Sequence, residues 1–281
     1  MAELPPVPLT LEGAWMLHQM FRIKRAEWRR VAQADRNAIL EEAREALVRM
    51  EPGATSGHAN QSAVYSLIGH KGDLMLLHFR ESLPQLHCAE QSIARLRLSD
   101  YLEPTHSYLS VVELGLYESS AKTYSSLAER GIEPHSEEWN AGIADVVARQ
   151  SSAMAPRLFP EIPPAKYICF YPMDRKRAEE KNWYQVPMPE RQRMMHDHGM
   201  IGRRYAEQVR QIISGSIGFD DWEWGVDLFA NDPLVFKKLI YEMRFDEVSA
   251  VYALFGTFYV GIRITSSDLS SVLAVSASSA N

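Results

Sequence analysis

The chain is poor in cysteine and contains no long apolar run. Its 281 residues include two cysteines, Cys88 and Cys169, which lie on segments predicted to be buried and form no CxxC pair. Zinc, iron–sulfur and disulfide frameworks therefore lack support. No stretch of roughly 18 consecutive apolar residues occurs, and the first residues lack the charged and apolar regions of a signal peptide. The sequence predicts a cytoplasmic protein in a reducing compartment, with no membrane span.

Excess positive charge and the common hydrolase and nucleotide motifs are also missing. The 30 basic and 36 acidic residues give a net charge of −6. This balance argues against sequence-independent binding of nucleic acid, which requires a basic stripe. No GxSxG, P-loop, HExxH or GxGxxG motif is present, so hydrolase, zinc-protease and nucleotide-binding functions lack their required residues. The 46% of hydrophobic and 23% of charged residues are typical of a globular protein.

Strand-like and helix-like patterns occur in the same order in the two halves of the chain. Alternating apolar residues predict strands, and the 3.6-residue period predicts helices. In the first half, strands are expected at 11–23, 62–68, 73–79 and 107–117, and helices at 25–50 and 83–98. In the second half, strands are expected at 166–173, 208–214, 222–230 and 255–264, with helices at 189–207 and after Asp232-Pro233. Each half has the order β-α-β-β-α-β.

This duplication predicts an α+β fold of two tandem ferredoxin-like units. Each antiparallel sheet has one apolar face to cover, so the two sheets should pair into a barrel-like subunit with helices outside. The expected divisions are an N-terminal half at 1–117, a linker or inserted helical arm at 118–164 and a C-terminal half at 165–265. Residues 266–281 are mostly Ser and Ala and should form a disordered tail.

Residues suited to a haem-type redox site gather in the second half. His198 has helical spacing and could ligate iron, although a structural histidine fits the same pattern. Gly199 and Gly202 could let a flat macrocycle approach the backbone, or could serve tight helix packing. Tyr171 ends a strand before Pro172, where it could relay an electron or simply fill the core.

Arginines could supply carboxylate contacts for such a site. Arg157, Arg175 and Arg244 carry guanidinium groups that pair bidentately with propionates. Most arginines in proteins are merely solvated. These three arginines can therefore form a carboxylate-binding site only if they lie close together in the folded protein.

These motifs together resemble the chlorite dismutase family, and within it the coprohaem decarboxylase branch. The similarity is close from Arg157 to Gly261 and is carried by Tyr171-Pro-Met173, Asn182-Trp-Tyr184, the segment HGMIGRRYA that begins at His198, GFDDWEWGV and YEMRFDEVSA. The resemblance implies two ferredoxin-like halves, a porphyrin in the C-terminal half and assembly into a homopentamer. It also implies a place in haem biosynthesis, with possible transient contact with the preceding ferrochelatase.

The resemblance further implies a role for individual residues. His198 matches the iron ligand, Tyr171 the tyrosine that becomes a radical, and Gln211 the distal residue. Glu247 or Asp246 is expected to orient the second ring nitrogen of His198. Arg175 stands where the family usually has lysine, so its hydrogen bonds to the substrate should differ. The expected porphyrin contacts are Arg157, Met173, Arg175, Trp183, Arg244 and Ser249.

The implied reaction converts iron-coproporphyrin III (coprohaem) into haem b with hydrogen peroxide. In it, peroxide oxidises the porphyrin iron and the oxidising equivalent passes to Tyr171. The tyrosyl radical then takes hydrogen from a propionate, which loses carbon dioxide and becomes a vinyl group. Two rounds give haem b.

Three further functions stay open beside this one. Chlorite dismutase or peroxidase-like activity is disfavoured by the neutral Gln211, because a distal arginine is suited to that chemistry. A non-catalytic haem-handling protein on the same barrel would bind the porphyrin without turnover. In a structural oligomer, His198 would be a core residue and no porphyrin would bind.

Overall fold

The N-terminal half forms a four-stranded antiparallel sheet with helices on one face. The computed structural model describes residues 5–51 and 60–274. In this half, the strand order is β4-β1-β3-β2, the order of a ferredoxin-like unit. Its elements are β1 (Thr10–Ile23), α1 (Arg25–Arg30), α2 (Gln33–Met50), β2 (Gln61–Ile68), β3 (Leu74–Arg80), α3 (Leu83–Ala94), η1 (Arg97–Tyr101) and β4 (Leu102–Gly115).

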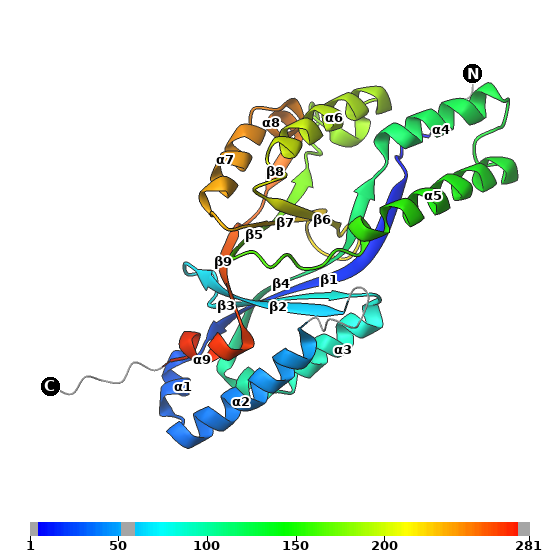
Figure 1. Cartoon of the computed structure of the whole chain (residues 1–281). Helices are drawn as coiled ribbons and strands as arrows, with labels where there is room; N and C mark the ends of the chain where they lie inside the picture. Colours follow the sequence, from blue (N-terminus) through cyan, green and yellow to red (C-terminus); the bar gives the residue numbers. More distant parts are fainter. Residues whose placement is uncertain (1–4, 52–59, 275–281) are drawn as a thin grey trace.

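The C-terminal half repeats this arrangement. Its strand order is β6-β7-β5-β9, with the short β8 added beside β5. Helices of this half cover the outer face of their sheet, as Figure 1 shows in its upper part. The elements are β5 (Tyr167–Arg175), η2 (Trp183–Gln185), α6 (Met188–Arg204), β6 (Arg210–Gly215), β7 (Trp224–Ala230), α7 (Leu234–Met243), α8 (Glu247–Tyr252), β8 (Ala253–Phe255) and β9 (Tyr259–Ile264).

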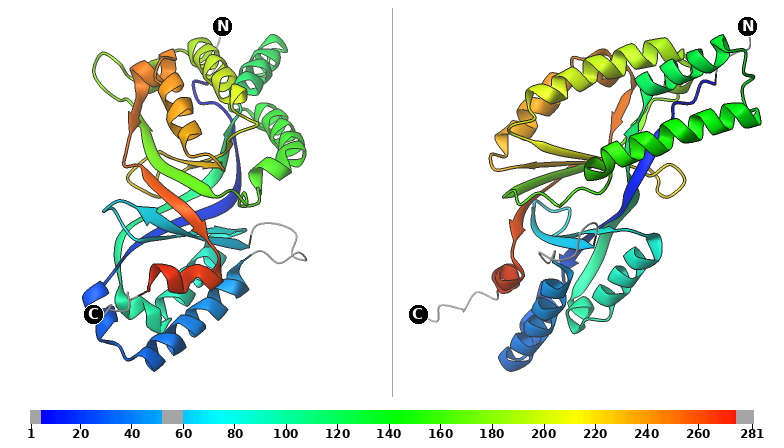
Figure 2. Two further views of the ribbon diagram at one scale, coloured as in Figure 1. Left: turned by 60° about the vertical axis from the view of Figure 1, so that its left-hand side comes forward. Right: turned by 45° about the vertical axis from the view of Figure 1, so that its right-hand side comes forward.

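The two sheets join at both edges into a closed ring of strands. β4 pairs with β6 at Val111↔Gly215, and β2 pairs with β9 from Val64↔Ile264 to Ile68↔Val260. The inner faces pack into one apolar core, and the helices lie on the outside of the ring in both views of Figure 2. The predicted α+β, barrel-like pair of ferredoxin-like units is therefore confirmed. Closure also protects sheet edges that would otherwise invite aggregation.

A fully buried polar pair joins the two halves inside this ring. His18 Nε2 of β1 lies 2.9 Å from Asp227 Oδ1 of β7, and neither side chain is exposed. The His18 ring stacks on Phe170 with 3.9 Å between centroids. Phe170 precedes Tyr171 on β5, so the two side chains point to opposite faces of the sheet. The stacking of His18 therefore packs β5 on the face opposite Tyr171.

Residues 118–164 consist mainly of two helices that project from the ring (Figure 1). They are α4 (Tyr117–Glu129) and α5 (Glu137–Leu158), and they pack together through Tyr124 and Trp139, whose ring centroids lie 5.6 Å apart. The end of α5 presses on β1, where a Cβ on Gly13 would lie 2.0 Å from the carbonyl oxygen of Leu158. Only glycine fits this approach.

Several predictions of local structure are wrong, among them the single strand at 255–264, which is divided between β8 and β9. The expected helix at 25–50 is broken, because Val31 and Ala32 are extended and turn the chain between α1 and α2. Cys88 is exposed on α3, since the buried face of that helix is formed by Leu86, Ala89 and Ile93 instead. The strand β4 begins at Leu102 rather than at residue 107.

A further error concerns the expected tail, which is ordered in its first part. Residues Ser266–Asp268 form η3 and Leu269–Val272 form α9. Leu269 and Leu273 are buried in the core beneath the helices of the N-terminal half, and Trp28 Nε1 donates to the carbonyl oxygen of Leu273 at 2.7 Å. These two leucines supply the apolar surface that orders a Ser-rich segment. Residues 275–281 of the expected tail lie outside the described residues.

Within the described residues, no helix is both long and apolar enough to cross a membrane.

Candidate functional site

Tyr171 lies on the helix-covered face of the C-terminal sheet. It follows Phe170 on β5, so it faces away from the ring interior, and it is only 3% exposed. Its ring stacks on Phe258 at 4.6 Å and lies 5.7 Å from Phe255. Burial raises the pKa of Tyr171, while Arg244 and Arg175 act in the opposite direction. Tyr171 is therefore a phenol at neutral pH, and the two arginines are near enough to influence it.

His198 is held by a carboxylate from the start of α8. Its Nδ1 lies 2.9 Å from Asp246 Oδ2, and Asp246 also accepts from the backbone N–H and hydroxyl of Ser249 at 2.8 and 3.1 Å. Burial alone would raise the pKa of Asp246, but the hydrogen bonds from His198 and Ser249 hold it below its usual value. The ionised carboxylate can only accept, so Nδ1 carries the hydrogen. Nε2 is then free to ligate a metal.

Asp246 rather than Glu247 is thus the partner of His198. Glu247 pairs instead with Arg193 on the surface, at 2.7 Å. Asp246 caps α8, and its position there follows from the turn between α7 and α8. The sequence allowed either of these neighbouring carboxylates, and the helix cap decides between them.

The two glycines of α6 are not required for close packing. A Cβ at Gly199 would meet no heavy atom of the described chain within 4 Å. At Gly202 it would reach only ordinary contact, 3.6 Å from Met243 Cε and 3.8 Å from Gln211 Oε1. The tight-packing interpretation therefore fails. The expected distal residue Gln211, on β6, lies beside Gly202 and hence next to the helix that carries His198.

Arg175 is a buried cation whose guanidinium meets aromatic rings. It is 9% exposed, and its guanidinium lies 5.0 and 6.0 Å from the ring centroids of Trp183 and Trp224. Nη2 reaches the sulfur of Met195 at 3.6 Å, whereas Nη1 is buried and has no hydrogen-bond partner among residues 5–51 and 60–274. Burial lowers the pKa of Arg175. Since buried charges are normally paired, a carboxylate-bearing ligand fits this place.

Of the remaining predicted porphyrin contacts, Arg244, Met173 and Ser249 lie near Tyr171 or His198, whereas Arg157 does not. Arg244, at the end of α7, is exposed and covers the Phe255 ring at 4.0 Å, next to Tyr171. Met173 packs on the same apolar cluster as Tyr171. Ser249 is buried beside Asp246. Arg157, in contrast, is exposed in the last turn of α5, and its guanidinium contacts Met154 at 4.0 Å rather than a predicted site residue.

Tyr117 belongs to the same region, and sequence reasoning did not single it out. It packs against the cluster formed by Trp183, Met194 and Val248. Burial raises its pKa, and Arg175 and Arg191 oppose that shift. Because Tyr117 follows the last strand of the N-terminal half, no motif of the second half could have indicated it.

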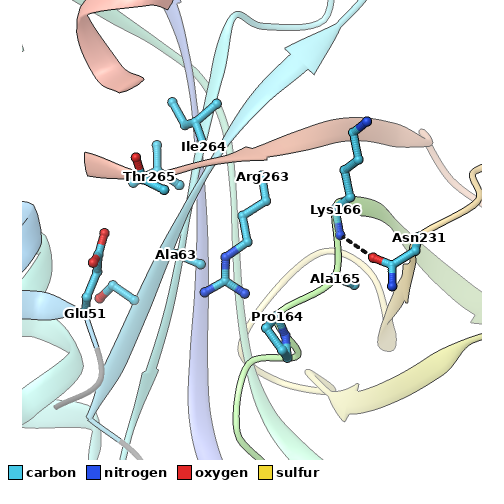
Figure 3. A pocket seen from close by; sticks show the side chains of 11 residues that line it. Glu51, Ala63, Pro164, Ala165, Lys166, Asn231, Arg263, Ile264 and Thr265 are labelled. Carbon is cyan, nitrogen blue, oxygen red and sulfur yellow. Dashed lines mark hydrogen bonds between the residues drawn. The ribbon is translucent and has the colours of Figure 1, made fainter. Parts of the chain in front are cut away.

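A separate cavity lies between the halves, away from these residues. Its volume is about 320 Å³, and Pro164, Lys166, Asn231 and Arg263 are among the residues that line it (Figure 3). None of the predicted site residues is in its lining. Among residues 5–51 and 60–274, no group of three or more metal-ligating side chains occurs. A single axial histidine, as in haem proteins, needs no such group.

The fold defines a double ferredoxin-like protein, and buried Arg175 near His198 and Tyr171 makes the helix-covered side of the C-terminal sheet a candidate site for a carboxylated ligand. The family model described as "Chlorite dismutase" matches residues 36–264. The chain belongs to the chlorite dismutase family, which confirms the resemblance carried by the motifs.

Individual relatives cover almost the whole chain. A "Coproheme decarboxylase" of Staphylococcus saprophyticus is 41% identical over 272 residues, which are 97% of this chain and 100% of the relative. One of Staphylococcus carnosus is 41% identical over 252 residues, 90% of this chain and 92% of the relative. A solved structure described as a heme-binding protein from Thermus thermophilus has a TM-score of 0.82 and 37% identity, covering 97% of this chain and 100% of the other.

Proposed function

We propose that this protein decarboxylates iron-coproporphyrin III and converts two of its propionates into vinyl groups, giving haem b. The observation that carries the proposal is the full-length similarity to proteins named coproheme decarboxylase. The site is consistent with it, because Tyr171, His198, Arg175 and Arg244 all lie on the helix-covered side of the C-terminal sheet. The proposed substrate is therefore an iron porphyrin with several carboxylates.

In this proposal, His198 binds the substrate iron through Nε2. Asp246 keeps the hydrogen on Nδ1 and raises the basicity of the imidazole, as carboxylates behind metal-bound histidines do. Ser249, through its two hydrogen bonds to Asp246, keeps the carboxylate in place. The bound iron porphyrin supplies the centre at which hydrogen peroxide is reduced and from which an oxidising equivalent reaches Tyr171.

Tyr171 would then carry out the hydrogen transfer. Its phenol loses a proton and an electron, and the resulting phenoxyl oxygen takes a hydrogen atom from the β-carbon of a propionate. A second electron leaves the propionate, the carboxylate departs as carbon dioxide, and a vinyl group forms. Each round consumes one propionate, one hydrogen peroxide and one proton, and yields one vinyl group, one carbon dioxide and two waters. The protonated state of buried Tyr171 provides the O–H bond that this cycle breaks and remakes.

Arg175 and Arg244 would hold the propionates that determine which group reaches Tyr171. Arg175 offers its buried Nη1 in a site bordered by Trp183 and Trp224. Hydrogen transfer tolerates little misplacement, so these contacts determine the reacting group. Met173 and Trp183 would line the apolar part of the macrocycle. Arg157 stays a predicted contact, although its guanidinium meets Met154 in the single chain.

The neutral side chain of Gln211 is expected on the distal side, beside Gly202. A neutral amide suits uncharged hydrogen peroxide better than an anionic oxidant such as chlorite. The homopentamer, the transient contact with ferrochelatase and the cytoplasmic location are part of the same proposal.

A second candidate is haem binding without turnover, which the description of the similar Thermus thermophilus protein favours. The two are separated by adding hydrogen peroxide stepwise to the protein with bound iron-coproporphyrin III and measuring product masses. A decarboxylase gives two successive losses of a carboxyl group, each accompanied by the consumption of one peroxide. Tight binding followed only by bleaching would instead establish the haem-binding function.

A further inference from the structure

A methionine sulfur lies against the guanidinium that is proposed to bind the substrate. Met195 is on α6, one turn before His198, and its Sδ lies 3.6 Å from Arg175 Nη2. Two indole rings lie close to Arg175, with their centroids 5.0 and 6.0 Å from its Cζ, and the N–H groups of a guanidinium donate in its plane. Met195 therefore contacts the Nη2 edge of the same guanidinium whose Nη1 is buried without a partner in the described residues.

A change at this sulfur would change what Arg175 can bind. A thioether is a weak acceptor, so Arg175 is held loosely and remains available to a carboxylate. A sulfoxide oxygen is a much stronger acceptor and would form a charge-assisted hydrogen bond with the guanidinium. The substrate carboxylate would then have to compete with it.

We propose that Met195 is a site of oxidation by hydrogen peroxide, and that its sulfoxide withdraws Arg175 from substrate binding. The inference rests on the proposed function, because that reaction brings hydrogen peroxide into this pocket. In the step, the O–O bond breaks as a new S–O bond forms. The sulfur loses two electrons, and the second peroxide oxygen leaves as water. Excess oxidant thus lowers the affinity of the site for its substrate.

Met195 is partly exposed and borders the buried cluster of Trp183, Met194 and Val248. The modification is also reversible, because methionine sulfoxide reductases restore the thioether. Met195 would then respond to the balance between peroxide and reductant.

The same helix provides two matched controls. Met194 is adjacent in sequence but only 3% exposed, and it packs in the cluster with Trp183 and Val248. Met200 is 45% exposed, and its sulfur accepts from Arg203 Nη1 at 3.5 Å. Met200 therefore tests whether an exposed methionine beside an arginine is oxidised, and Met194 tests whether burial protects.

The experiment treats the porphyrin-free protein with hydrogen peroxide and removes the peroxide with catalase. Peptide mass spectrometry then measures sulfoxide at each methionine, and titration measures affinity for iron-coproporphyrin III. Wild-type protein should gain one oxygen at Met195 and bind the porphyrin about tenfold more weakly than before treatment. In Met195→Leu, a swap of similar volume, the affinities before and after treatment should be equal. Met194→Leu and Met200→Leu should keep the tenfold loss.

Two results would overturn the proposal. One is a Met195 that stays unoxidised while Met200 is converted. The other is an oxidised Met195 with unchanged porphyrin affinity. No turnover enters this assay, so a failure to form vinyl groups would count against the proposed function alone. If the untreated protein bound no iron-coproporphyrin III, the proposed function and the effect on Arg175 would both fail, while the masses would still show whether Met195 is oxidised.

Discussion

Asp246 Oδ2 accepts a hydrogen bond from His198 Nδ1 at 2.9 Å, and this contact leaves Nε2 as the free nitrogen of the ring. His198 lies on α6 and Asp246 caps α8, 48 positions further along the sequence. The contact fixes the orientation and the tautomer of the imidazole, as is usual for histidines that ligate metals.

Replacing Asp246 with Asn should weaken iron ligation. An amide is neutral, so the imidazole becomes less basic and its orientation less fixed. We expect porphyrin affinity to fall by roughly 10- to 100-fold and the iron–histidine stretching frequency in the resonance Raman spectrum to decrease. Glu247→Gln is the matched control, because Glu247 pairs with Arg193 on the surface. Equal effects of the two substitutions would contradict the assignment of Asp246.

The same carboxylate should make stability depend on pH in the acid range. The pKa of Asp246 is lower in the folded protein than in the unfolded chain, where it is about 3.9. Its stabilising contribution is therefore complete above that value and is lost as the pH falls through the lower, folded pKa. The melting temperature of the wild type should exceed that of Asp246→Asn at pH 7, and the difference should shrink below about pH 4. A difference that stays constant down to about pH 2 would count against this linkage.

Arg175 should contribute more to the binding of iron-coproporphyrin III than Arg210, which is exposed on β6. Arg175→Met removes the buried cation beside two indoles and should weaken binding of iron-coproporphyrin III by ~30-fold. Arg175→Lys keeps the charge but loses the planar fork, so it should retain part of the affinity. Arg210→Met, at an exposed position of β6, is the control and should bind normally. If Arg175→Met bound the porphyrin as tightly as wild type, Arg175 would not be a propionate contact.

The fold could be predicted from the sequence because both halves repeat the same alternation of strand and helix patterns. Local sequence patterns were less informative where a tertiary contact determines whether a segment forms a helix or is ordered. The break at Val31 and Ala32 contains neither Gly nor Pro, and Leu269 and Leu273 order a Ser-rich segment only through contact with the core. Cys88 was predicted to be buried but is exposed on α3, whereas its neighbour Ala89 is buried. Adjacent residues of a helix can point to opposite sides of the boundary between core and solvent.

The sequence indicated candidate site residues where they sit in one continuous segment. The motifs between Tyr171 and Ser249 indicate His198, Tyr171 and Arg175, which lie on one side of the C-terminal sheet. Tyr117 and Met195 were not indicated, because their importance lies in which side chains they touch. Arg157 is the opposite case, a residue that matches the family pattern but whose guanidinium contacts Met154 in the single chain.

Hydrogen transfer through Tyr171 is tested by comparing wild type with Tyr171→Phe. Both proteins are loaded with iron-coproporphyrin III, given two equivalents of hydrogen peroxide, and followed by product mass and by the visible spectrum. The substitution keeps the ring packed on Phe258 but removes the O–H group. We predict that the variant binds the porphyrin as wild type does, within a few-fold, and forms no vinyl product, while wild type yields haem b. Formation of haem b by Tyr171→Phe at the wild-type rate would show that Tyr171 does not carry the hydrogen transfer.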